Sequence, residues 1–131
     1  MPLEGQHRTK AERNAQFAES QDLTDPIRES WAVIASFYSA VHYVEEFFLK
    51  YGNPCVNHMD RNNQFKGDKR IRNAYASYEY LYSMSRKARY KCEPLPDKVY
   101  TKFAKPQLAA VKQQIDHAMN LAARAQETSG K

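Results

Sequence analysis

One long helical pattern constrains the fold of this chain more than any other feature. Asp25 followed by Pro26 is typical of a helix start, because the carboxylate can accept backbone N–H bonds and proline fits the first turn. Gly52 is typical of a helix end. The pattern predicts a helix over residues 26–51 that is buried over most of its circumference. Its apolar positions form a stripe with a wide flank: Ile27, Trp31, Ile34, Tyr38, Val41, Phe48 and Leu49, widened by Val33, Phe37, Val44 and Phe47.

Helical patterns also cover most of the remaining chain. Residues from about 127 onward have nothing to bury and are expected to fray. We therefore expect a single all-α domain over residues 1–131, an up-and-down bundle of about four to five helices. Four segments besides the long helix are predicted to be helical: residues 4–21, a short segment from Asn57 to Gly67, a tyrosine-rich segment over 68–91, and a last segment from Pro106.

The distribution of apolar residues and cysteines excludes several protein classes. Polar residues interrupt the longest apolar stretch, residues 31–49, so no window resembles a membrane span. The first residues lack the apolar segment of a secretory signal, and Cys55 and Cys92 are interpreted as reduced thiols of a cytoplasmic protein. One C-x-x-H pair, Cys55 with His58, is too little for a metal site, so neither a metal nor another cofactor is expected.

Basic residues are concentrated in one part of the chain. The segment 66–91 holds eight basic residues against two acidic ones, whereas the whole chain has a net charge of +5. Tyrosines are interleaved with these charges. Cations together with aromatic faces suit a partner that carries phosphates and bases, such as RNA or a nucleotide. A solvated helix surface explains the same charges, so the pattern leaves both interpretations open.

A few polar residues occupy positions on apolar stripes, where burial without a partner is costly. Glu45 lies between Val41 and Phe48 on the long helix, and His42 projects from the same side three residues earlier. Arg89 continues the apolar stripe of the tyrosine-rich helix. We expect Glu45 to be buried and to pair with an arginine or a histidine, with Arg89 as the first choice.

The short helix carries a second polar pair, His58 and Arg61, which share one face. In a functional interpretation these two are catalytic, since an imidazole and a guanidinium suffice for phosphodiester cleavage without a metal. In a structural interpretation, Glu45 and Arg89 form an ion pair that fixes helix register, and His42 is a satisfied core histidine. The functional interpretation adds a set that binds phosphate or ligand: Arg89, Arg86, His42, Glu45 and Tyr90.

Four features together resemble small bacterial proteins of the HEPN superfamily over residues 7–121. These are His7 with Asn14 on the first helix, WAVIASFYSAVHYVEEFF on the second, NHMDR at the third and YEYLYSMSRKARY on the fourth. The resemblance implies an up-and-down bundle, frequent homodimerisation, and a superfamily whose active members are metal-independent ribonucleases in toxin, phage-defence and CRISPR systems. Many members are inactive binding modules.

The chain departs from the catalytic pattern of that superfamily. HEPN ribonucleases carry an arginine followed four to six residues later by a histidine, and no histidine here has such an arginine upstream. The order in His58-x-x-Arg61 is reversed. We expect an HEPN-like homodimer that binds RNA or a nucleotide, with ribonuclease activity as a further expectation. The alternative is a non-catalytic protein-interaction module, such as a toxin–antitoxin component.

Overall fold

The computed structural model describes residues 5–91 and 94–129, and every element in these ranges is helical. The prediction of an all-α bundle of about four to five helices is therefore confirmed. Cys92 lies outside the described residues. The elements are α1 (Gln6–Glu19), α2 (Pro26–Tyr51), α3 (His58–Gly67), the 3₁₀ turn η1 (Arg72–Ala74), α4 (Tyr75–Tyr90), the π-helical turn η2 (Tyr100–Ala104) and α5 (Lys105–Ser129).

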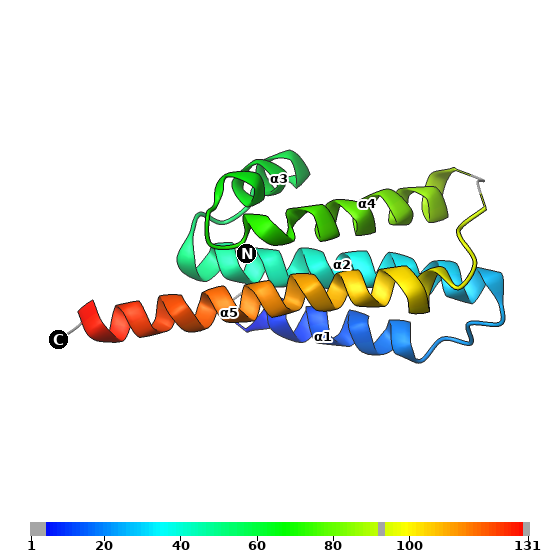
Figure 1. The fold of residues 1–131 in the computed structure, drawn as a ribbon, viewed down its shortest axis with the longest axis horizontal. Helices are drawn as coiled ribbons and strands as arrows, with labels where there is room; N and C mark the ends of the chain where they lie inside the picture. Colours follow the sequence, from blue (N-terminus) through cyan, green and yellow to red (C-terminus); the bar gives the residue numbers. More distant parts are fainter. Residues whose placement is uncertain (1–4, 92–93, 130–131) are drawn as a thin grey trace.

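Helix α2 forms the centre of the bundle, and α1, α4 and α5 pack against it (Figure 1). The chain direction alternates, with α1 and α4 running one way and α2 and α5 the other. The short helix α3 lies at one end of the bundle, beside the start of α4. No helix among the described residues combines the length and the apolar character that crossing a membrane requires.

The ends of α2 are the predicted ones. The Asp25 side chain accepts a hydrogen bond from the backbone N–H of Ile27 at 2.9 Å, and Pro26 occupies the first turn. Gly52 ends the helix, and a Cβ at this position would lie 2.8 Å from Cδ1 of Phe48. Close packing against that ring therefore favours glycine at the end of α2.

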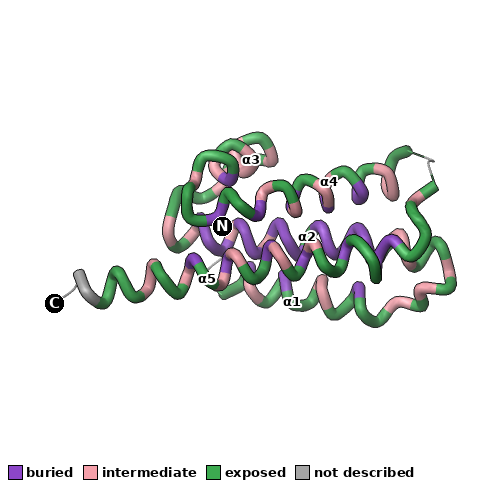
Figure 2. The backbone as a smooth tube through the Cα atoms, viewed as in Figure 1, coloured by how far each residue is buried: buried purple, intermediate pink, exposed green. Residues whose placement is uncertain are grey.

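Burial is concentrated on α2, as Figure 2 shows. The core centres on Val33, Val44 and Phe47, which the sequence pattern placed on the flank of the stripe. The prediction is wrong at the start of the helix, where Ile27 is 70% and Trp31 53% exposed. Neighbouring helices cover the side of α2 that carries Val33 and Val44. The buried side is therefore rotated about the helix axis relative to the predicted stripe, and one edge of that stripe is left in solvent. Tyr38, on the same edge, is also exposed.

Helix α4 begins later than predicted, at Tyr75 instead of near residue 68. The reason is local: Asp68 accepts hydrogen bonds from the backbone N–H of Arg70 at 2.9 Å and from its guanidinium at 2.7 Å, which holds a turn before η1. Tyr78 and Leu81 form the inner face of α4 and are fully buried. Helix α5 continues to Ser129, and fraying of the last residues stays a prediction.

Candidate functional site

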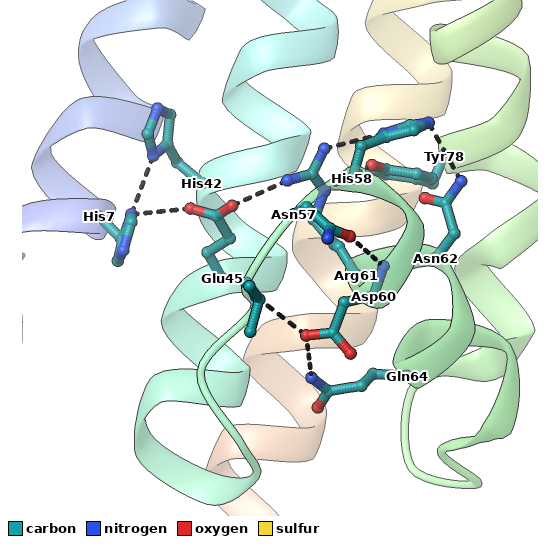
Figure 3. A network of polar contacts seen from close by, with 11 residues as sticks. His7, His42, Glu45, Asn57, His58, Asp60, Arg61, Asn62, Gln64 and Tyr78 are labelled. Atoms are coloured by element: carbon teal, nitrogen blue, oxygen red, sulfur yellow. Dashed lines mark hydrogen bonds and ion pairs between the residues drawn. The ribbon is translucent and has the colours of Figure 1, made fainter. Parts of the chain in front are cut away.

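A connected set of polar side chains joins α1, α2 and α3 (Figure 3). It runs from His7 on α1 through Glu45 on α2 to Arg61, His58 and Asn62 on α3. Three of these residues, Glu45, Arg61 and His58, are candidates predicted from the sequence. The bundle therefore brings them together, and it adds His7 and Asn62.

The first turn of α3 is fixed by its own side chains. The Asn57 side chain accepts from the backbone N–H of Asp60 at 2.8 Å, as expected for the predicted N-cap. The Asp60 carboxylate in turn accepts from the backbone N–H of Val56 at 2.9 Å and from the Gln64 amide at 3.2 Å. These bonds set the start of α3, so that Arg61 projects toward α2 and α4.

Arg61 anchors α3 to the bundle. Its Nε donates to the Tyr78 hydroxyl at 2.8 Å, its Nη1 donates to Oε1 of Glu45 at 2.8 Å, and its Nη2 lies 3.0 Å from Nδ1 of His58. Only 11% of the side chain is exposed. Burial acts to lower the pKa of Arg61, but the Tyr78 and Glu45 contacts outweigh it and raise the pKa. Arg61 is therefore a charged, positioning residue of the fold.

His58 has a protein partner at each ring nitrogen. A guanidinium can only donate, so Nδ1 accepts from Arg61 and the proton of the neutral ring is on Nε2. The Asn62 amide lies 3.2 Å from Nε2, and its Oδ1 is buried without a partner among the described residues. Exchanging the nitrogen and oxygen of this amide gives the Nε2–H an acceptor, and the hydrogen-bond network assigns that orientation.

The charge state of His58 follows from its surroundings. Burial, followed by the positive charges of Arg61, Arg86 and Arg89, lowers the pKa of His58 below its usual 6.5. The ring also packs against Tyr82, with the two centroids 4.6 Å apart and the ring planes tilted by 35°. His58 is thus a neutral, half-buried ring at the boundary between the polar set and the outer surface of α4.

A second group lies at the other end of the network, where His7 meets His42. Their Nδ1 atoms are 2.9 Å apart, and Nδ1 of His7 is 3.5 Å from Oε2 of Glu45. Burial and the neighbouring His7 lower the pKa of His42, which outweighs the opposite effect of Glu45. Asn14, the other residue noted on the first helix, donates to the backbone oxygen of Lys10 and makes no contact with this group.

Arginines and tyrosines form a third feature, on the surface made by α4 and the first half of α2. Arg89 donates to the Tyr38 hydroxyl at 2.7 Å and its guanidinium lies 4.8 Å from the centre of the Tyr90 ring. Arg86 donates to the Tyr82 hydroxyl at 3.0 Å. We call these five residues the arginine–tyrosine face. His58 adjoins it through the Tyr82 ring.

The predicted pairing of Glu45 with Arg89 is wrong. Glu45 is partly buried and pairs with Arg61 and His7, whereas Arg89 bonds Tyr38 and the backbone oxygen of Ser85. The reason is the position of Arg89 along the axis of α4. Arg61 bonds Glu45 and Tyr78 together, and Arg89 lies about 16 Å farther along α4 than Tyr78, at the level of Tyr38.

The more deeply buried carboxylate, Glu46, was not among the residues predicted from the sequence. This residue is only 7% exposed, and the Nε atom of Arg8 donates to it at 3.0 Å. Nη2 of Arg8 donates to Asp116 on α5 at 2.7 Å, so one guanidinium ties three helices together. The sequence feature that could have predicted this buried carboxylate is the position of Glu46 inside the long apolar helix. A buried carboxylate there needs a partner, as Glu45 does.

The C-x-x-H pair does not form a cation-binding set among the described residues. Among the described residues, the group that could hold a metal ion is His7, His42 and Glu45. Neither Cys55 nor His58 belongs to that group. Burial raises the pKa of the Cys55 thiol to about 11, which keeps it protonated at neutral pH.

Comparisons with protein-family models, with curated proteins and with solved structures found no match for this chain.

Proposed function

We propose that this chain binds RNA or a nucleotide through the arginine–tyrosine face. The supporting observation is the placement of two guanidinium groups against tyrosine rings at the surface: Arg89 beside Tyr38 and Tyr90, and Arg86 beside Tyr82. Tyr90 is 69% exposed. Guanidinium groups bind phosphate oxygens through paired hydrogen bonds, and exposed aromatic rings stack with bases.

The surrounding charge supports the same partner. The segment 66–91 carries the excess of basic residues, which includes Arg86 and Lys87 on α4 and Lys91 directly after it. Lys91 and Arg86 are exposed and Lys87 is partly exposed. A polyanion approaching α4 therefore meets a positive surface before it reaches the rings, and it releases counterions on binding.

The geometry favours binding over cleavage. A general acid or base needs a ring nitrogen directed at the substrate, but both nitrogens of His58 have protein partners. Arg61 uses three of its five N–H donors on Glu45, Tyr78 and His58. In this proposal Arg61 and Glu45 position α3, and His58 offers a ring edge beside Tyr82. His42 contacts His7 and is not one of the five residues of the arginine–tyrosine face.

We further propose that the protein is a homodimer and that it is located in the cytoplasm, where RNA is present. Helix α5 projects beyond the other helices at its C-terminal end (Figure 1). Leu121 on this part of α5 is 51% exposed and, with Tyr51, Ala118 and Ala122, forms the apolar part of a hollow that Lys50 and Arg70 also line. A second copy would cover this apolar surface.

Fluorescence anisotropy with a labelled single-stranded RNA tests the binding proposal. The parent should bind with an affinity that falls as salt rises, because phosphate contacts release counterions. The double variant Arg86→Ala/Arg89→Ala should bind at least about tenfold more weakly, with a salt slope reduced by about two. The same samples, incubated and run on a denaturing gel, show whether any RNA is cleaved.

A charge-matched control separates the face from net charge. Arg13→Ala/Lys102→Ala removes two exposed positive charges from other elements and should leave affinity close to that of the parent. If the parent shows no salt-dependent binding, or if both double variants lose affinity equally, the proposal fails. The protein-interaction module then becomes the better interpretation.

A further inference from the structure

Three atoms that can each donate a lone pair converge between α1 and α2. They are Nδ1 of His7, Nδ1 of His42 and Oε2 of Glu45, separated by 2.9 Å between the two nitrogens and by 3.5 Å from His7 to the carboxylate. Ligand atoms of the three residues all lie within 4.8 Å of one another.

The two printed separations, 2.9 and 3.5 Å, lie close to the spacing of ligand atoms in a transition-metal site. Ligands held about 2.0 to 2.1 Å from a tetrahedral ion lie about 3.3 to 3.4 Å apart, so small movements of side chains would place all three on one ion. Two imidazoles with one carboxylate is also a donor set that leaves a coordination position open.

The scaffold around these residues is fixed. The buried hydroxyl of Ser39 donates to the backbone oxygen of Ala11 at 2.7 Å, one turn from both histidines, and locks α1 against α2. Oε1 of Glu45 is held by Arg61 at 2.8 Å, which leaves Oε2 directed at His7. Carboxylate ligands at metal centres are commonly held in this way by an outer hydrogen bond.

We propose that His7, His42 and Glu45 bind a divalent transition-metal ion, with Zn²⁺ as the representative. Imidazole nitrogens select this class over Ca²⁺ and Mg²⁺, which prefer sets of oxygens. The positive charges of Lys10 and Arg61 lie near His42, and their repulsion of a cation reduces the affinity of the site for the metal ion. This inference does not depend on the proposed RNA binding, since the arginine–tyrosine face lies on other residues.

The experiment uses the full chain without an affinity tag, after treatment with EDTA and desalting. Isothermal titration with ZnCl₂ should give one ion per chain, and Zn²⁺ should raise the melting temperature because it binds the folded state. His7→Gln and His42→Gln should each weaken Zn²⁺ binding at least about tenfold and abolish the thermal shift. Circular dichroism confirms that each variant is folded, and His7→Asn replaces His7→Gln if that variant is not.

Three controls locate the site. His58→Gln, His117→Ala and Cys55→Ser remove other potential ligands and should bind Zn²⁺ like the parent. Co²⁺ in place of Zn²⁺ should give visible absorption bands that both His7→Gln and His42→Gln lose. The proposal is overturned if the parent binds no Zn²⁺, if the folded His7 and His42 variants bind it like the parent, or if a control variant loses binding to the same extent.

Discussion

Arg61 of α3 donates a hydrogen bond to Glu45 of α2 across 2.8 Å, and these side chains are 11% and 22% exposed. The pair links the short third helix to the centre of the bundle. Since Tyr78 of α4 accepts a second bond from the same guanidinium, Arg61 connects three helices. The strength of this connection can be measured by removing one partner at a time.

Glu45→Ala should lower the free energy of unfolding by about 2 kcal/mol, because Arg61 is left mostly buried without its carboxylate. The loss is smaller than for a fully buried pair, since water reaches part of Glu45. Urea unfolding followed by circular dichroism measures it. Glu79→Ala, at an exposed position of α4, is the control and should change stability by less than about 0.5 kcal/mol. Equal losses in the two variants would contradict the prediction.

Arg8→Ala should cost more, about 3 kcal/mol, because it leaves Glu46 buried and unpaired. It also removes the bond to Asp116 and the contact of the guanidinium with the Tyr43 ring at 4.8 Å. The same urea experiment measures this loss. Arg13→Ala, on the exposed side of α1, is the matched control. A loss in Arg8→Ala that does not exceed the loss in Arg13→Ala would refute the role of Arg8.

Stability should fall as pH drops below about 7. The pKa values of His42 and His58 lie below the usual 6.5, mainly because both rings are partly buried. The unfolded state therefore binds more protons than the folded state as pH passes below 6.5, and this favours unfolding. Lys10 and Arg61 act in the same direction on His42, whereas Glu45 opposes them.

Urea midpoints at pH 7.5, 6.5 and 5.5, measured in EDTA, test this sign. The parent should lose stability across the series, and the double variant His42→Gln/His58→Gln should lose less. The carboxylates Asp116 and Glu19, whose pKa values are lowered by their cationic partners, do not titrate in this range. Parallel slopes for the parent and the double variant would show that the two histidines are not responsible.

Light scattering at tens of micromolar protein should give twice the chain mass of 15.2 kDa, because in the proposed dimer a second copy covers the exposed Leu121 side chain of α5. Leu121→Glu should shift the protein toward the monomer by placing a charge in that contact. Gln113→Glu adds the same charge at an exposed position of α5 and should leave the mass unchanged. A monomer mass for the parent would refute the dimer.

The helices could be predicted from the sequence because their signals are local. Asp25 and Pro26 start α2, Gly52 ends it, and Asn57 caps α3, each through contacts within a few residues. The spacing of His42 and Glu45 likewise placed both on one side of α2, since positions three apart on a helix are neighbours.

Only the tertiary structure decided which polar groups meet. Glu45 pairs with Arg61 instead of Arg89, and His7 meets His42, because pairing depends on how far each helix is shifted along its neighbour and how it is rotated about its own axis. Packing of whole helix faces sets the shift and the rotation. Spacing along one helix carries no information about either, so the exposure of Trp31 and the contacts of the polar site follow from the assembled bundle.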